Sequence, residues 1–383
     1  MRTWLYLLLA AVLLAAVIPM TGCGEGNVIK IGALLDTSGA NSPLGIPEKQ
    51  TLEMMQKQIN DNGGINGKQL KIIIRDTGGV ESEAISLATK LIEQDNVVAI
   101  IGPTSTGESL AVIDTVNSKG VPLISLAADE RITLPVGSST WVFKTPQTTF
   151  MAVQQIYAYI HAQGFGKIAI MTDKKGFGAG GKKDLLGQAL HYSLQIVSEQ
   201  SFNNEDNIWD SYIADIKQSG AEAVVCWGTN PGPANFAKEL KKQDIPFFGS
   251  HGIANMSFIT LAGDAANGVV FPSGKLIVAS QLSDSDPQKA MLLNFIADYE
   301  AKYGAGTCNT FAGHAYDALT MLKTSLGLAG IADRAKVRDE LEKIHDFAGT
   351  GGIYNMSPQD HCGLSLGCMI DAKIENGHWV LLP

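Results

Sequence analysis

Short apolar runs alternate with amphipathic segments along most of this chain, and this alternation constrains the fold more than any other feature. The apolar runs have the length and β-branched content of buried strands, and the segments between them have a helical apolar period. The first expected strands cover residues 28–35, 71–75, 97–102 and 121–126. The helices expected between them cover residues 48–60, 81–94 and 106–118. Such repetition predicts a parallel sheet with right-handed crossovers.

The same alternation restarts after residues 141–146 and produces a second set. Its expected strands cover residues 167–171, 195–201, 223–227 and 247–249. Its expected helices cover residues 148–163, 185–192, 209–218 and 233–243, and three more are expected over 286–303, 314–328 and 335–344. A length of 383 residues is enough for two domains. We therefore predict an α/β fold with two Rossmann-like lobes, each built on a parallel sheet.

Residues 1–22 have the pattern of an export signal. Arg2 gives a positive start, and the apolar run of residues 5–18 ends at Pro19. That run would span about 21 Å as a helix, which is short of a hydrocarbon core of about 30 Å. Simple secretion is one interpretation. The other is that Thr21-Gly22-Cys23, which resembles a bacterial lipobox, is cut before Cys23 and the thiol is lipidated.

No later stretch approaches the length of a membrane span. The mature protein is therefore expected to be extracytoplasmic, periplasmic or at the cell surface, and attached to the membrane only through its N-terminal lipid. Besides Cys23 itself, four cysteines remain after cleavage before Cys23. Cys362 and Cys368 are close enough in sequence to close a small loop in an oxidising compartment, and Cys226 is expected to be a buried free thiol.

Charge and motifs exclude several function classes. Asp plus Glu number 38 against 29 Lys plus Arg, with no basic run, so nucleic acid is not an expected partner. The chain has neither a G-x-S-x-G nor an H-E-x-x-H motif, and acids such as Asp173 and Asp206 are interpreted as solvated surface charges. His361 beside Cys362 is a weak metal motif. We therefore predict no enzymatic activity, no cofactor and no metal site.

Residues 176–182 satisfy two nucleotide motifs, G-x-G-x-x-G and G-x-x-x-x-G-K. However, residues 173–175 separate these glycines from the expected strand, whereas a dinucleotide turn follows its strand directly. Lys183 also stands where a phosphate loop needs a Ser or Thr to hold Mg²⁺. We interpret the glycines as a cleft loop that lets Phe177 approach a ligand.

The loop after the third expected strand has the composition of an anion site. Residues 102–107 read Gly-Pro-Thr-Ser-Thr-Gly and lead directly into a helix. Glycines let the backbone approach a ligand, hydroxyls add donors, and the free N–H groups of a helix start favour an anion such as a carboxylate. The simpler alternative is that Ser105 or Thr106 only caps the helix.

The order and spacing of several motifs resemble the leucine/isoleucine/valine-binding receptors of ABC importers. These motifs are Ile31-Gly-Ala-Leu-Leu-Asp-Thr-Ser-Gly39, Gly63-Gly-Ile-Asn-Gly67, Ile101-Gly-Pro103, Val121-Pro-Leu-Ile-Ser125, Phe143-Lys-Thr145, Leu261-Ala-Gly-Asp-Ala-Ala-Asn-Gly268, Tyr316-Asp-Ala-Leu319, Asp360-His361 and Gly363-Leu364. The resemblance implies a type I periplasmic binding protein with hinge crossovers. Such a protein captures a branched-chain or related amino acid between two closing lobes and delivers it to the permease subunits.

On that basis we expect a signal peptide at residues 1–22 and a tether at 23–27. Lobe 1 would comprise residues 28–145 plus 276–350, and lobe 2 would comprise residues 146–275 plus 351–383. The resemblance also places the contacts to a ligand carboxylate on Ser105, with Thr104 and Thr106 beside it, and on the Ala127 and Ala128 backbone.

At the family's ammonium contacts this chain departs from the pattern. The corresponding positions are Asp129, Phe177, Asn230 and His251. Asp129 could supply the negative charge that His251 lacks, with the ligand side chain against Phe177 and Trp227. If Asp129 turns outward, an aromatic or aliphatic carboxylate or an amide becomes the better ligand. A ligand sensor of the same fold is the other alternative.

Overall fold

The first set of strands forms a five-stranded parallel sheet in the computed structural model, which describes residues 27–330 and 332–383. The strands are β1 (Val28–Leu35), β2 (Gln69–Asp76), β3 (Ala99–Ile101), β4 (Leu123–Ser125) and β5 (Val142–Lys144), and their order is β2-β1-β3-β4-β5. The crossovers carry α1 (Ser42–Asp61), α2 (Glu81–Glu93) and α3 (Thr106–Lys119). The predicted signal peptide and Cys23 lie outside the described residues.

The second sheet has seven strands and is mixed. It contains β6 (Lys167–Asp173), β7 (Gln195–Phe202), β8 (Ala223–Trp227), β9 (Phe247–Gly249), β10 (Val270–Gly274), β13 (Met369–Glu375) and β14 (His378–Leu381). Their order is β14-β13-β10-β9-β8-β6-β7. β13 runs antiparallel to β10 and β14 antiparallel to β13, so the predicted parallel sheet holds only for β6 to β10. An Asn376-Gly377 turn with positive φ at both residues joins β13 to β14, as in a tight hairpin.

The helices of the second lobe follow the predicted pattern with two differences: the helix expected at residues 185–192 begins earlier, and an additional helix covers Met256–Ala262. They are α4 (Thr149–Ala162), α5 (Gly176–Gln188), α6 (Asp210–Ser219), α7 (Gly232–Lys241) and α8 (Met256–Ala262). α5 begins at Gly176, so the glycines that we interpreted as a cleft loop form its first turns. Their lack of a side chain serves helix packing, because a Cβ on Gly181 would lie 2.1 Å from Trp227 Cδ1.

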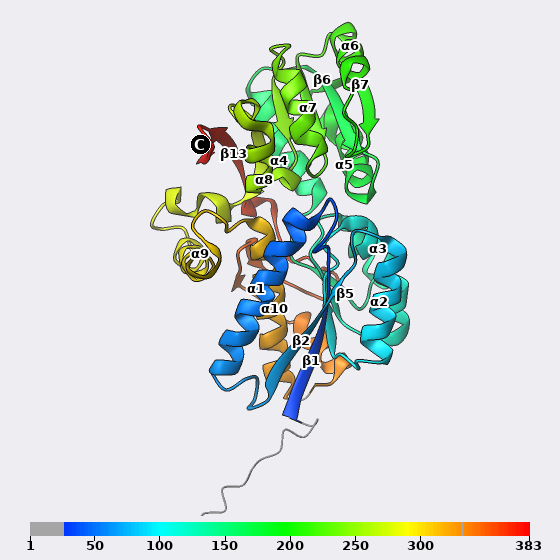
Figure 1. The fold of residues 1–383 in the computed structure, drawn as a ribbon, viewed down its shortest axis with the longest axis vertical. Coiled ribbons are helices and arrows are strands. Elements are labelled where there is room, and N and C mark those ends of the chain that lie inside the picture. The colour runs from blue at the N-terminus through cyan, green and yellow to red at the C-terminus, as the bar shows by residue number, and fades with distance from the viewer. Residues whose placement is uncertain (1–26, 331) are drawn as a thin grey trace, which may run out of the picture.

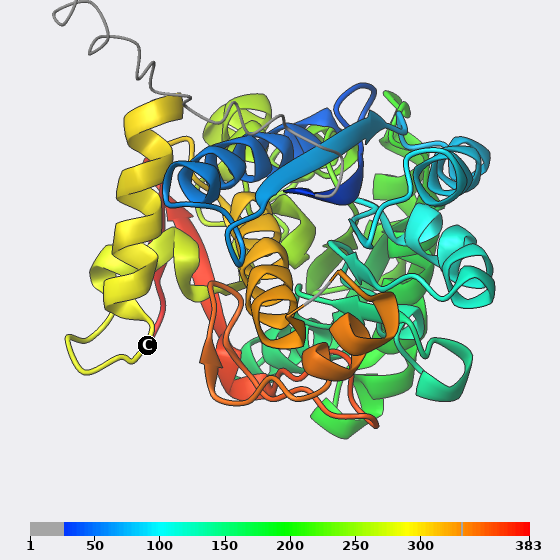
Figure 2. The same ribbon diagram turned by 90° about the horizontal axis from the view of Figure 1, so that it is seen from below.

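The chain returns to the first lobe after β10. α9 (Lys289–Tyr303), α10 (Thr310–Ala329) and α11 (Arg334–Leu341) follow, then the short strands β11 (Phe347–Ala348) and β12 (Ile353–Tyr354). α10 lies alongside α1, as Figures 1 and 2 both show. The chain thus passes between the two sheets after β5, after β10 and after β12. The residue boundaries of the two domains remain a prediction.

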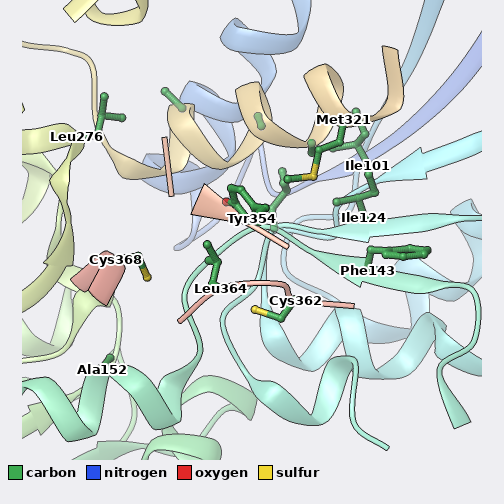
Figure 3. Close-up of a cluster of buried hydrophobic side chains, with 14 of the residues drawn as sticks. Ile101, Ile124, Phe143, Ala152, Leu276, Met321, Tyr354, Cys362, Leu364 and Cys368 are labelled. Carbon is green, nitrogen blue, oxygen red and sulfur yellow. The ribbon is translucent and has the colours of Figure 1, made fainter. Parts of the chain in front are cut away.

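A continuous hydrophobic cluster joins the two lobes. It includes Ile31 and Ile101 of the first sheet together with Ile168, Trp227 and Phe248 of the second. Figure 3 shows the part of this cluster near α10 and α4, including Tyr354 and the segment of Cys362 and Cys368. Both of these cysteines, and Cys226, are free and buried. Within the described ranges, no helix has the length and apolar character needed to cross a membrane.

Candidate functional site

A cavity of about 630 Å³ lies at the carboxyl ends of strands from both sheets. In the first sheet β1 lies between β2 and β3, and in the second β6 lies between β7 and β8. Open parallel sheets bind ligands at such points, where successive connections leave a strand in opposite directions. The loop after β3 and the loop after β6 both line the cavity. Its size is that of a small-molecule site.

Most of the site residues predicted from the sequence line this cavity. They are Thr104, Ser105, Thr106, Ala127, Ala128, Phe177 and His251. Thr104 and Thr106 are almost fully buried, and they lie with Ser105 where α3 begins. Asp129 and Asn230 are not among the lining residues. The structure therefore brings seven of the nine predicted residues to one cavity.

Gly102 allows the loop of residues 102–107, here called the Ser105 loop, to pack closely against β1. Gly102 has a φ of +96°, and a Cβ there would lie 2.1 Å from the carbonyl oxygen of Leu34. Ser105 precedes the first residue of α3, yet its hydroxyl caps no backbone N–H of the helix. It hydrogen-bonds instead to the Glu108 carboxyl, with 2.5 Å between Oγ and Oε2. The geometry does not support the simple capping role for Ser105.

The structure pairs Asp129 with a charged partner of its own. Arg131 donates from Nε to Oδ1 at 2.9 Å and from a terminal nitrogen to Oδ2 at 2.6 Å. The same guanidinium donates to the Gly176 carbonyl oxygen at 3.1 Å, and Asp129 is fully buried. Bidentate pairing of this kind occupies the carboxylate. The geometry therefore does not favour Asp129 as the partner of a ligand ammonium.

Asn230 is also turned away from the cavity. Its amide donates to Ser257 Oγ at 2.9 Å, at the start of α8. His251 does line the cavity, and its ring lies 5.2 Å from that of Phe177 and 5.6 Å from that of Trp227, both edge-on. Trp227 itself is fully buried behind the lining residues.

Two histidines at the cavity are uncharged. Burial and the nearby Lys144 ammonium lower the pKa of His251 to about 3. The pKa of His314, on α10, is also lowered to about 3, first by burial and then by His251 and Lys144. Neither ring nitrogen of His251 has a hydrogen-bond partner in the described part of the chain. A neutral imidazole cannot balance an ammonium group as a carboxylate does.

Asp173 is a cavity residue that the sequence analysis placed on the surface. It ends β6, is only 4% exposed and lines the cavity. Its Oδ1 accepts the backbone N–H of Lys175 at 2.8 Å and that of Gly178 at 3.2 Å. Burial raises the pKa of Asp173 to about 6. Its position at the carboxyl end of a strand was the signal that could have identified it.

Other lining residues were not identified from the sequence. Thr310, Phe311 and His314 come from the start of α10, which packs against α1 and brings these residues to the cavity. Thr229 follows β8 and Ser273 lies in β10, a strand that the sequence analysis did not predict. The cavity thus combines strand-end residues, which follow from topology, with helix residues placed by tertiary packing.

Comparisons with known proteins agree with this architecture. A family model described as "Periplasmic binding protein" matches residues 28–377. A Pseudomonas aeruginosa protein named leucine-, isoleucine-, valine-, threonine-, and alanine-binding protein is 25% identical over 331 residues, or 85% of each chain. A Leu/Ile/Val-binding protein homolog from Brucella abortus is 27% identical over 270 residues, which cover 69% of this chain and 71% of that one.

Solved structures share the fold. An extracellular ligand-binding receptor from Rhodopseudomonas palustris superimposes with a TM-score of 0.87 and 26% identity, covering 93% of this chain and all of that one. A branched-chain amino acid transporter substrate-binding protein from Streptococcus pneumoniae, solved with isoleucine, has a TM-score of 0.80. It is 24% identical over 93% of this chain and 100% of that one, and this second likeness shows the fold alone.

Proposed function

Because the chain belongs to the periplasmic binding protein family, we propose that it captures an amino acid between its two lobes and delivers it to the membrane subunits of an ABC importer. The observation that carries the proposal is the cavity between the sheets, where the hydroxyl-rich start of α3 faces the loop after β6. The named relatives that bind leucine, isoleucine and valine support an amino acid of the branched-chain or a related class. Family membership implies an extracytoplasmic location and supports a substrate-binding role.

In the proposed complex the ligand carboxylate lies at the start of α3. The Ser105 hydroxyl and the first N–H groups of the helix would donate hydrogen bonds to it, with Thr104 and Thr106 beside it and the backbone of Ala127 and Ala128 opposite. Asp173 would receive the ammonium group, because it is the buried carboxylate among the lining residues. Phe177 would cover the ligand from the first turn of α5.

One observation favours a second candidate. His251 and His314 line the cavity as neutral side chains, so neither supplies a negative charge for a ligand ammonium group. An aromatic or aliphatic carboxylate, or an amide, would leave no ammonium to neutralise there. The same binding event could also serve ligand sensing. A screen of purified residues 24–383 against amino acids, amides and aromatic acids separates these candidates.

The screen measures the melting temperature, because a ligand at 100 times its Kd stabilises the folded state by about 2.7 kcal/mol. We expect amino acids to raise it. A screen in which aromatic acids raise the melting temperature and no amino acid does would favour the second candidate. Gene neighbours encoding a permease and an ATPase, rather than a histidine kinase, would support import.

Ser105→Ala tests the carboxylate position. Loss of a hydrogen bond to a buried charged group costs about 1–3 kcal/mol, so we expect the affinity for any carboxylate ligand to fall by about that amount. Isothermal titration calorimetry measures it, and unchanged affinity would place the carboxylate elsewhere. Gly187→Ala is a suitable control, since a Cβ there would have no neighbour within 4 Å.

We also propose that a lipid on Cys23 attaches the protein to the membrane. It is supported by the Thr21-Gly22-Cys23 pattern behind the apolar run of residues 5–18. Several acyl chains on one N-terminus hold a protein firmly to a membrane, whereas one chain holds it weakly. Mass spectrometry of the native N-terminus decides the question: an unmodified N-terminus at another residue would mean plain secretion.

A further inference from the structure

Three buried carboxyl groups lie directly behind the hydroxyls of the Ser105 loop. Asp36 follows β1, Glu48 lies on α1, and Glu108 lies in the first turn of α3, and all three are fully buried. Glu48 bonds to Thr104 Oγ1 at 2.5 Å, and Glu108 bonds to Ser105 Oγ at 2.5 Å. Two of the three hydroxyls that line the cavity from this loop therefore have a carboxyl partner.

Hydrogen bonding distinguishes the three carboxyl groups. Both oxygens of Asp36 have donors: Oδ2 accepts from Asn41 Nδ2 at 2.9 Å, and Oδ1 accepts from Thr77 Oγ1 at 2.6 Å and from the Gly79 N–H at 3.1 Å. Oε1 of Glu48 and Oε1 of Glu108 are buried without a partner in the described part of the chain. A charged carboxylate with an unpaired buried oxygen is costly, so a neutral form is favoured for both glutamates.

The charges around Glu108 also favour its neutral form. Burial and the neighbouring Asp36 carboxylate raise the pKa of Glu108 to about 8, against the smaller lowering effects of Ser105 and Thr77. No salt bridge involves Glu108 within the described ranges. The elements around α3 carry the following other charged groups: Glu48 on α1, Glu81 on α2, Glu130 and Arg131 after β4, Lys144 on β5, and Lys175 before α5.

The protonation state of Glu108 determines whether the Ser105 hydroxyl can donate a hydrogen bond to a ligand. A serine hydroxyl has one proton to donate and two lone pairs to accept with. If Glu108 is ionised, Ser105 must give its proton to Glu108, and the Glu108 charge repels an anion in the cavity. If Glu108 is neutral, its O–H donates to Ser105 Oγ and the serine proton is free to turn to the cavity.

We propose that Glu108 is a positioning residue that, as a neutral carboxylic acid, donates to Ser105 Oγ and directs the serine O–H toward the ligand carboxylate. The inference rests on the proposed function, since it takes the ligand anion to lie at Ser105. Its consequence is a proton linkage: the anion binds to the protein with Glu108 protonated and raises the pKa of that group further. For a carboxylate ligand without an ammonium group, affinity should be constant below about pH 7 and fall about tenfold for each pH unit above the free-protein pKa of Glu108.

The experiment measures affinity by calorimetry from pH 6 to pH 9.5. The probes are L-leucine, L-isoleucine, L-valine, L-threonine, L-alanine and 4-methylpentanoate, the last of which has no ammonium group to titrate. Glu108→Gln keeps a donor to Ser105 at every pH, so we expect it to lose the alkaline fall and to bind about tenfold more tightly than the wild type at pH 9. Glu108→Leu has no donor to Ser105 and should bind more weakly than Glu108→Gln at every pH.

Glu48→Gln is the matched control, because Glu48 is a buried carboxyl of the same cluster bonded to the other hydroxyl. The alkaline fall should persist in it. In the ligand-free protein, carbon NMR of labelled glutamates should show a carboxyl resonance that is neutral at pH 7 and absent from Glu108→Gln. A Glu108 resonance that is already ionised at pH 6 would overturn the inference.

The calorimetry distinguishes a failure of the proposed carboxylate site from a failure of the proposed role of Glu108. If no probe binds, or if Ser105→Ala binds as the wild type does, the carboxylate site is wrong and the positioning role falls with it. If Ser105→Ala weakens binding while the wild type and Glu108→Gln share one pH profile, the site stands and only the role of Glu108 is overturned.

Discussion

Asp173 and Asp129 differ in whether the carboxylate is available to a ligand. Asp173 lines the cavity, whereas Asp129 is paired with Arg131 at 2.6 Å. We expect Asp173→Asn to weaken the binding of leucine by several kcal/mol, because an enclosed ammonium would lose its counter-charge. Binding of 4-methylpentanoate, which has no ammonium, should change little. Calorimetry with the two ligands measures the difference.

Asp129→Asn is the control for that experiment. It leaves Arg131 without its bidentate partner, so the melting temperature should fall, while both ligands keep a similar affinity ratio. If Asp129→Asn rather than Asp173→Asn removed the preference for leucine, Asp129 would be the ammonium partner after all.

The lowered pKa of His314 should make the stability of the protein depend on pH. This pKa is lowered to about 3 in the folded protein, against an ordinary value near 6.5, and the side chain is 5% exposed. Between these values the unfolded chain binds more protons, so the free energy of unfolding falls as the pH drops below about 6.5. From pH 6.5 to 4.5 the wild type should lose about 2–3 kcal/mol more than His314→Gln.

Urea unfolding at several pH values tests this, with His345→Gln as the control, since His345 is exposed. The control should follow the wild type. Parallel curves for the wild type and His314→Gln would mean that the pKa of His314 is not lowered in the folded protein.

At the scale of one element, α5 needs glycine at some positions and not at others. A Cβ on Gly181 would lie 2.1 Å from Trp227 Cδ1, and the buried indole cannot move away, so Gly181→Ala should cost about 3 kcal/mol or more. Gly187 is exposed in the same helix, and a Cβ there would have no neighbour within 4 Å. Gly187→Ala should therefore raise the free energy of unfolding by about 0.5 kcal/mol, because alanine has the higher helix propensity. Chemical unfolding of both variants compares them. Equal effects would mean that Trp227 does not constrain α5.

For the whole molecule, the shared core predicts a single unfolding transition. One hydrophobic cluster contains side chains of both sheets and of α4 and α10, so neither lobe can open its core without exposing part of the other. We expect calorimetry to give one peak with equal calorimetric and van't Hoff enthalpies. Two separable peaks would show that the lobes unfold independently. A saturating ligand should shift the one peak upward as a whole.

Much of the fold follows from residues that are neighbours in sequence. A strand buried on both faces is a continuous apolar run, so β1, β8 and β9 could be predicted at their observed bounds. The start of α3 after β3 places Ser105, Thr104 and Thr106 together by local geometry alone. Where glycines were read as a loop, local propensity misled, because α5 is held by packing of Gly181 on Trp227.

The remaining features of the fold and the site depend on contacts between residues that are far apart in the chain. The sequence by itself determined the alternating strands and helices, two lobes and a hydroxyl-rich loop at a strand end, because these follow from periodicity and adjacency. Only the tertiary structure decided that Asp173 is buried at the cavity, that His314 reaches it from α10, and that Glu108 lies against Asp36 behind Ser105. The physical reason is that burial and charge pairing depend on which segments meet, and a local pattern does not specify that.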